Sequence, residues 1–176
     1  MTTENPKTGL RQIAGITFLT FAARGLAIPF VGLYLKSLGF QGTEIGFLTS
    51  VSALVQLLLT PALNTLADRA GAHRRLYTGM LVSSIMAGLG FVAFAGNRFL
   101  LGGAVILRDS SDTPNAALLS QLTITWLDRR KQAIYGRLRA WGSLGWAVTT
   151  FVSGRIIAIG GYPLLFILYG VINLAL

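Results

Sequence analysis

The stretch Tyr135-Gly-Arg-Leu-Arg-Ala-Trp-Gly-Ser-Leu-Gly-Trp146 combines chemically different side chains at helical spacing. If it is helical, Arg139, Ser143 and Trp146 fall at i, i+4 and i+7 and share one face. Two glycines three residues apart make another side small, so a neighbouring backbone can approach it closely. The stretch therefore predicts a helix that presents a charge, a hydroxyl and an aromatic ring on one face and packs tightly on another.

The composition around this stretch is typical of a membrane protein. Of 176 residues, 53% are hydrophobic and 12% are charged, whereas soluble domains carry about a quarter charged residues. Long apolar runs add to this and indicate an integral membrane protein. The chain has no cysteine and one histidine, His73, which excludes disulfides, thiolate metal sites, His-based metal clusters and a Ser/His triad. We expect no metal, no cofactor and no enzymatic activity.

Six apolar segments approach the length of a membrane crossing, which takes roughly 20 mostly apolar residues. They lie at about residues 12–35, 44–66, 76–95, 99–127, 138–159 and 162–176. Residues 1–11 are polar and read as a cytoplasmic lead-in. Short, glycine-containing linkers imply that segments adjacent in the sequence pack antiparallel in one bundle, residues 12–176. The predicted fold class is an all-α polytopic transmembrane bundle of six helices.

The basic residues predict which ends of the segments face the cytoplasm. With the N-terminus inside, the cytoplasmic side receives nine of them: Lys7, Arg11, Arg69, Arg74, Arg75, Arg129, Arg130, Lys131 and Arg137. The outer side receives three: Lys36, Arg98 and Arg155. We therefore expect a multi-pass protein of the cell inner membrane with a cytoplasmic N-terminus. Because most of the net charge of +9 lies in these short loops, nucleic acid is not an expected partner.

The sixth segment is shorter than a membrane crossing. From Pro163 to Leu176 it would form roughly 21 Å of helix, against a hydrocarbon core of roughly 30 Å. This favours the interpretation that the chain is the N-terminal half of a larger protein and works with a six-helix C-terminal half. A natural six-helix protein that acts with a second copy of itself is the alternative.

The fourth segment is unusually polar at its centre, with the run Arg108-Asp-Ser-Ser-Asp-Thr-Pro-Asn115. Charges at membrane depth are costly and usually mark function. The i, i+4 spacing predicts that Arg108 pairs with Asp112. Asp109 then needs a partner from another helix, and Arg24 of the first segment is the candidate. We favour a water-filled cavity lined by these four charged side chains; a structural ion-pair network is the alternative.

Five polar or aromatic residues are candidates for contact with a solute. Arg139, Ser143 and Trp146 offer charge-assisted hydrogen bonds and a stacking surface for a polar ring. Asn115 continues the face of Arg108 on the fourth segment, and Gln121 lies near that face. The alternatives are that Arg139 extends to the membrane interface and that Trp146 packs in the core.

The run Asp68-Arg-Ala-Gly71-Ala-His-Arg-Arg75 resembles the loop signature of the major facilitator superfamily. Arg108 stands where the arginine of that family's fourth helix is expected. Tyr135–Trp146 is similar to the start of the fifth helix in the lactose permease branch, the sugar and nucleoside proton symporters. The resemblance covers essentially the whole chain and implies two three-helix inverted repeats, half of a twelve-helix transporter. It also implies that Asp68, Arg69, Gly71, Arg74 and Arg75 form a cytoplasmic gate loop.

The same resemblance implies roles in solute binding. In that branch the arginine and tryptophan that match Arg139 and Trp146 engage the sugar, the tryptophan by stacking. The carboxylate that pairs with this arginine is replaced here by Gln121, and Asp112 is the nearest acid on that helix. The glycine-proline signature of drug antiporters is missing from the fifth segment, which reads Gly142-Ser-Leu-Gly145. This weighs against an exporter of that class.

Together these features predict a secondary active transporter, a proton-coupled symporter of a small polar solute such as a sugar, working by alternating access. Arg24, Arg108, Asp109 and Asp112 would form an intramembrane charge network that serves coupling. The expected partners are the lipid bilayer, the solute, protons, and the C-terminal half or a second copy. The alternative is a half-transporter or non-transporting membrane module that works only in assembly with a partner half.

Overall fold

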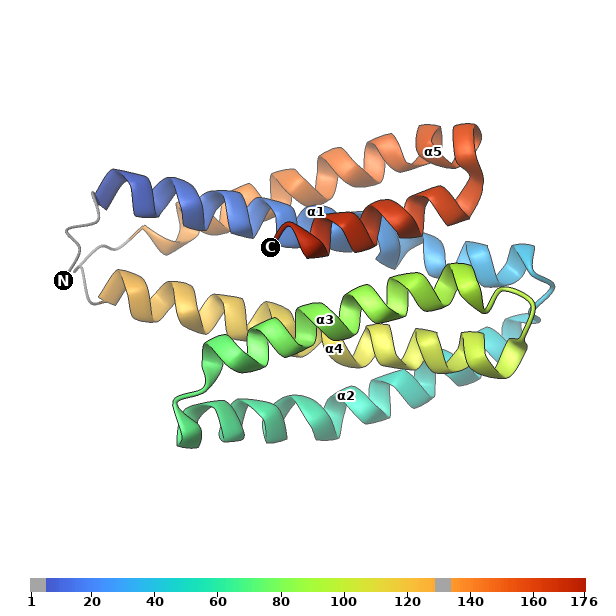
Figure 1. Cartoon of the computed structure of the whole chain (residues 1–176), viewed down its shortest axis with the longest axis horizontal. Helices are drawn as coiled ribbons and strands as arrows, with labels where there is room; N and C mark the ends of the chain where they lie inside the picture. Colours follow the sequence, from blue (N-terminus) through green and yellow to red (C-terminus); the bar gives the residue numbers. More distant parts are fainter. Residues whose placement is uncertain (1–5, 129–133) are drawn as a thin grey trace.

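The computed structural model describes residues 6–128 and 134–176, and these residues form an all-helical bundle (Figure 1). The helices are α1 Pro6–Ser37, α2 Gly42–Ala70, α3 His73–Ala93, α4 Arg98–Asp128 and α5 Tyr135–Leu174. Because α1 begins at Pro6, part of the expected lead-in is helical. Three basic residues assigned to the cytoplasmic side, Arg129, Arg130 and Lys131, lie outside the described residues.

Helix α5 changes direction at Gly161, so the described residues form five helices where the sequence predicted six separate ones. Gly161 has φ 69° and ψ −172° inside the helix, a backbone conformation that is essentially restricted to glycine. Pro163 follows two residues later. Figure 1 shows the orange and red limbs of α5, residues 135–160 and 162–174, running back alongside each other. The predicted fifth and sixth segments are therefore the two limbs of one bent element.

Four of the described helices are long and apolar enough to cross a membrane. They are Gly9–Ser37 within α1, and all of α2, α3 and α5. Helix α4 is 31 residues long, which corresponds to about 46 Å, but it carries three charged residues at its centre. Length and composition thus agree with a helical membrane bundle in which α4 is the polar helix.

The helices that pack most closely are mostly not neighbours in the sequence. Helix α1 packs mainly against α5, while α4 packs against α3 and α2, and α3 also packs against α5. The expectation that sequence neighbours pack side by side holds for α3 and α4 but is wrong for α1 with α2 and for α2 with α3. Short loops limit the distance between helix ends, whereas the side chains along the helices decide which faces come together.

Glycines bring α1 and α5 into close contact, and the small face predicted for the Tyr135–Trp146 stretch is the face that meets α1. A Cβ atom on Gly145 would collide with the backbone carbonyl of Phe18, and one on Gly142 would collide with the ring of Phe21. In the opposite direction, a Cβ atom on Gly25 would meet the backbone of α5. Each helix therefore presents bare backbone to the other, which allows the close packing typical of membrane helices.

An aromatic cluster joins α1, α3 and the second limb of α5 at one end of the bundle. The rings of Phe91 and Phe166 stack with centroids 4.5 Å apart, and Tyr34 lies 5.0 Å from Phe166. The Tyr34 hydroxyl donates a hydrogen bond of 2.6 Å to the carbonyl of Phe91. Since all three residues are buried, this cluster fixes the end of α1 whose middle carries Arg24.

Candidate functional site

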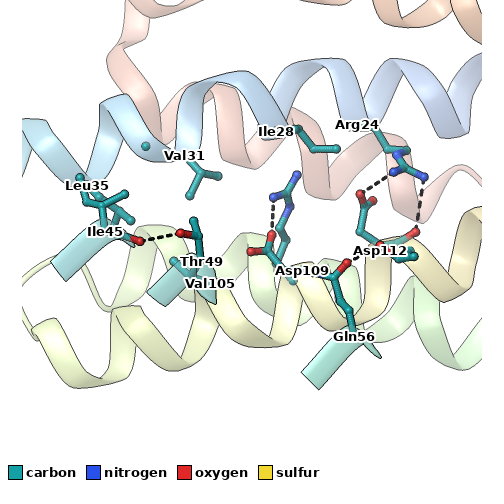
Figure 2. Close-up of a pocket in the computed structure, with 13 residues that line it drawn as sticks. Arg24, Ile28, Val31, Leu35, Ile45, Thr49, Gln56, Val105, Asp109 and Asp112 are labelled. Carbon is teal, nitrogen blue, oxygen red and sulfur yellow. Dashed lines mark hydrogen bonds and ion pairs between the residues drawn. The ribbon is translucent and has the colours of Figure 1, made fainter. Parts of the chain in front are cut away.

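A polar cavity of about 350 Å³ lies between α1, α2 and α4 (Figure 2). One wall is apolar and includes Ile28, Val31 and Leu35 of α1. The polar and charged residues that line the cavity are Arg24, Thr49, Gln56, Arg108, Asp109, Asp112 and Thr113. The charged network predicted from the sequence thus lines one cavity, and its four members come from α1 and α4.

The ion pairs within this network differ from the predicted ones. Arg24 pairs with Asp112, with 3.2 Å between Nη2 and Oδ2, and Arg108 pairs with Asp109, with 2.6 Å between Nη1 and Oδ1. The predicted pairs, Arg108 with Asp112 and Arg24 with Asp109, are wrong. Helical spacing allows the i, i+4 contact, but the packing of α1 on α4 places Arg24 against Asp112. Arg108 then turns to its neighbour in the sequence.

The network leaves unused hydrogen-bonding capacity. Arg108 is 4% exposed, and its Nε and Nη2 have no hydrogen-bond partner among the described residues; the same is true of Nε of Arg24. Buried donors without partners are costly, so such groups are usually satisfied by protein, water or ligand. The cavity can therefore supply N–H donors to a molecule that brings oxygen acceptors.

Helix α2 contributes polar residues that the sequence reasoning missed. The Thr113 hydroxyl donates a hydrogen bond of 2.6 Å to Oε1 of Gln56, which ties α4 to α2 at the cavity. Thr49 also lines the cavity, although its hydroxyl bonds carbonyls of its own helix. A glutamine in an otherwise apolar segment was a signal that could have identified Gln56, whereas threonines are too common in membrane helices to stand out.

Arg139 lies next to the network but outside the cavity. Its Cζ sits 4.0 Å from the ring centroid of Phe21, and Cζ of Arg24 lies 5.3 Å from the same centroid. Among the described residues, no carboxylate pairs with Arg139. Arg139 lines a narrow pocket of about 10 Å³ together with Phe21 of α1 and with Ser120 and Thr123 of α4. The guanidinium of Arg139 is thus held by an aromatic ring.

The structure does not gather the five predicted solute-binding residues around the cavity. Arg139, Ser143 and Gln121 are exposed and Trp146 is partly buried, while Asn115 is 3% exposed and its Oδ1 has no partner. None of the five lines the 350 Å³ cavity. The expected solute contacts therefore lie outside the cavity that the charge network lines, and the Phe21 ring lies close to both Arg24 and Arg139.

The expected gate loop connects α2 to α3. Gly71 has φ 59°, a left-handed conformation that favours glycine and allows the chain to reverse. Oδ1 of Asp68 lies 2.9 Å from Nε2 of His73, the first residue of α3. The remaining members of the loop, Arg69, Arg74 and Arg75, are exposed. The loop therefore presents a cluster of basic groups around one acid–histidine contact.

Comparison with known proteins assigns this helical bundle to a family. Residues 10–176 match the family model described as the MFS_1 like family. The chain belongs to the MFS_1 like family. The match covers almost the whole chain, including α4 with its charged centre, and this family lies within the major facilitator superfamily of transporters. Membership agrees with a multi-pass membrane protein.

Two kinds of relative in this superfamily are similar to the chain. The quinolone resistance protein NorA of Staphylococcus aureus is 38% identical over 68 residues, which are 39% of this chain and 18% of NorA. The maltose permease of Geobacillus stearothermophilus is 28% identical over 138 residues, which are 78% of this chain and 34% of the permease. The matched part of this chain thus spans at most about a third of the length of these relatives.

Proposed function

We propose that the chain is the N-terminal half of a proton-coupled secondary transporter for a small polar solute such as a sugar. The observation that carries this proposal is the cavity between α1, α2 and α4, in which two arginines and two aspartates meet inside an apolar bundle. Ionisable side chains at membrane depth usually mark a solute or proton pathway. Small-molecule sites commonly have volumes of about 300–1,000 Å³, so the cavity is large enough for a small solute.

The ion pairs support proton coupling in a specific way. Asp112 is 7% exposed and has Arg24 as its charged partner. If Asp112 takes up a proton, it loses its charge and Arg24 is left with an uncompensated one, which is unfavourable in a buried site. A rearrangement of α1 against α4, or an acceptor oxygen from a solute, would relieve that charge. Proton uptake and solute binding would then favour each other.

The expected solute contacts complete the proposal. Arg139, Ser143, Trp146, Gln121 and Asn115 would contact the solute in a conformation in which a second half of the transporter closes over them. The loop from Asp68 to Arg75 would form the cytoplasmic gate. The protein would lie in the cell inner membrane with its N-terminus in the cytoplasm. Two three-helix repeats, the second ending in the limbs of α5, would give the alternating-access movement. The similarity to a maltose permease supports a sugar as the solute.

Uptake by reconstituted vesicles tests the proposal. The chain would be incorporated alone, and together with a co-expressed six-helix C-terminal half, and uptake of labelled sugars would be followed with and without an inward proton gradient. We expect gradient-driven accumulation only in the two-half preparation. Asp112→Asn should abolish accumulation, because the carboxyl that would carry the proton is removed, but the protein that remains folded should still exchange solute across the membrane. Sugar uptake that is equal with and without the proton gradient, or no uptake of any sugar, would contradict the proposal.

A further inference from the structure

The ring of Phe21 lies close to two guanidinium groups that belong to different parts of the proposed transporter. Arg24 belongs to the charge network of the cavity, and Arg139 is an expected solute contact on α5. The two Cζ atoms lie 5.3 Å and 4.0 Å from the Phe21 ring centroid. Cations within about 6 Å of an aromatic face are attracted by its quadrupole. Phe21 therefore contacts both charged groups at once.

The position of the Phe21 ring is restricted by its surroundings. On α5, the backbone of Gly142 leaves no room for a Cβ atom next to the ring. On α4, Ser120 and Thr123 line the same narrow pocket as Phe21 and Arg139. The ring, which belongs to α1, thus faces two other helices, and a shift of α5 relative to α1 would change its contacts. A movement of this ring in turn changes what Arg24 can contact.

Arg24 has two possible partners, the carboxylate of Asp112 and the ring of Phe21. Its Nη2 is paired with Asp112 at 3.2 Å, and its Nη1 lies 3.5 Å from the backbone carbonyl of Asp112. Its Nε has no hydrogen-bond partner in the part of the chain that the structure describes. Arg139 has no ion pair among the described residues. A solute that pairs with Arg139 would therefore compete with the Phe21 ring for the Arg139 guanidinium. Arg24 would then be the remaining cation in contact with the ring.

We propose that Phe21 is a positioning residue that links Arg139, on the solute side, to the Arg24–Asp112 ion pair. The inference rests on the proposed function for its biological meaning, but the link itself is a property of α1, α4 and α5. When Arg139 leaves the ring, Phe21 attracts Arg24 more strongly and weakens its hold on Asp112. The ring therefore transmits the state of the solute site to a carboxylate that would carry the proton.

A cysteine reporter in the cavity tests this link without any solute. The chain has no cysteine, so Ile28→Cys creates a single thiol. Ile28 is partly buried, lines the cavity and lies one helical turn from Arg24 (Figure 2). A nearby guanidinium favours the thiolate, which is the form that reacts. The rate of alkylation by a small water-soluble reagent therefore reports the position of Arg24.

The experiment is a double-mutant cycle in this reporter background, on the full chain in detergent micelles. Arg139→Gln should change the alkylation rate about threefold when Phe21 is present, as expected for an aromatic–cation contact of modest strength. In Phe21→Leu, which keeps an apolar side chain but removes the ring, Arg139→Gln should have no further effect. Phe21→Tyr keeps the ring and should keep the response.

The outcomes separate this link from the proposed function. Equal effects of Arg139→Gln with and without the ring, or no effect in either background, would overturn the link. A Tyr variant that behaves like the Leu variant would also overturn it, because the ring would then not be the cause. If the cycle is non-additive but reconstituted vesicles take up no sugar, the link stands and the transport proposal fails. If uptake is proton-coupled but the cycle is additive, the transport proposal stands and the link through Phe21 fails.

Discussion

Arg24 of α1 and Asp112 of α4 form an ion pair at 3.2 Å across 88 residues of sequence. Their side chains are 18% and 10% exposed, so the pair lies largely away from solvent. A buried pair is often no more stabilising than an apolar pair of similar size, whereas removal of one partner alone is strongly destabilising. The pair is therefore informative about function and also sensitive to single substitution.

This sensitivity gives a first prediction. Arg24→Gln or Asp112→Asn should each lower the free energy of unfolding in detergent micelles by about 3 kcal/mol, because each leaves one buried charge without its partner. The double variant should lose less than the sum of the two. Arg98→Gln is the matched control, since the Arg98–Glu44 pair is 55% and 40% exposed and should contribute less than about 1 kcal/mol. Equal losses for the buried and the exposed pair would contradict the prediction.

A second prediction concerns the contact between α1 and α5. Gly145→Ala should lower the free energy of unfolding by about 1–3 kcal/mol, because the new methyl group meets the backbone carbonyl of Phe18 and the helices must separate. Gly154→Ala on the same helix is the control, since a Cβ atom there has no neighbour within 4 Å. Denaturant titration of both variants measures the difference, and comparable stability of the two would show that the contact is not close.

The bend of α5 leads to a third prediction. Gly161→Ala should cost about 1–3 kcal/mol, because φ 69° with ψ −172° is strained for any residue with a Cβ atom. Gly170→Ala, in the second limb, should be nearly neutral, since nothing lies within 4 Å of its Cβ position. Thermal unfolding in detergent would compare the two variants. A Gly161→Ala protein as stable as the parent would mean that the reversal does not depend on this backbone conformation.

The fourth prediction tests whether Trp146 stacks on the solute. Stacking of an aromatic ring contributes about 1 kcal/mol beyond the area it buries, so Trp146→Ala should weaken solute affinity at least about fivefold. Trp146→Phe keeps a ring and should lose clearly less. Competition binding to the two-half transporter, with the best sugar from the uptake screen, measures both affinities. Equal losses for the two variants would indicate that Trp146 serves packing.

Local sequence patterns predicted the helices and their close contacts well. The apolar segments matched helices because hydrophobic length decides what can cross a bilayer, and Gly142 and Gly145 predicted the tight face of α5. The turn at Gly71 and the break at Gly160–Gly161 were also visible, since glycine marks the backbone conformations that other residues avoid. The polar centre of α4 indicated the cavity before its shape was known.

The candidate site was predicted only in part. The four charged residues do line one cavity, yet their pairing was wrong, and Gln56 and Phe21 were not identified at all. Spacing along one helix tells which of its side chains share a face, and this made Arg108 and Asp112 look like partners. It says nothing about the rotation and axial shift of a second helix, which bring Arg24 to Asp112.

The sequence by itself determined that this protein is an all-α membrane bundle with a charged fourth helix, because hydrophobic length, glycine positions and intramembrane charges are local properties. Only the tertiary structure decided which charges pair, and that Arg24 and Arg139 both lie close to the Phe21 ring. The physical reason is that contacts between helices depend on how whole faces fit together. The non-neighbouring pairs α1–α5 and α2–α4 bring together residues that no local pattern connects.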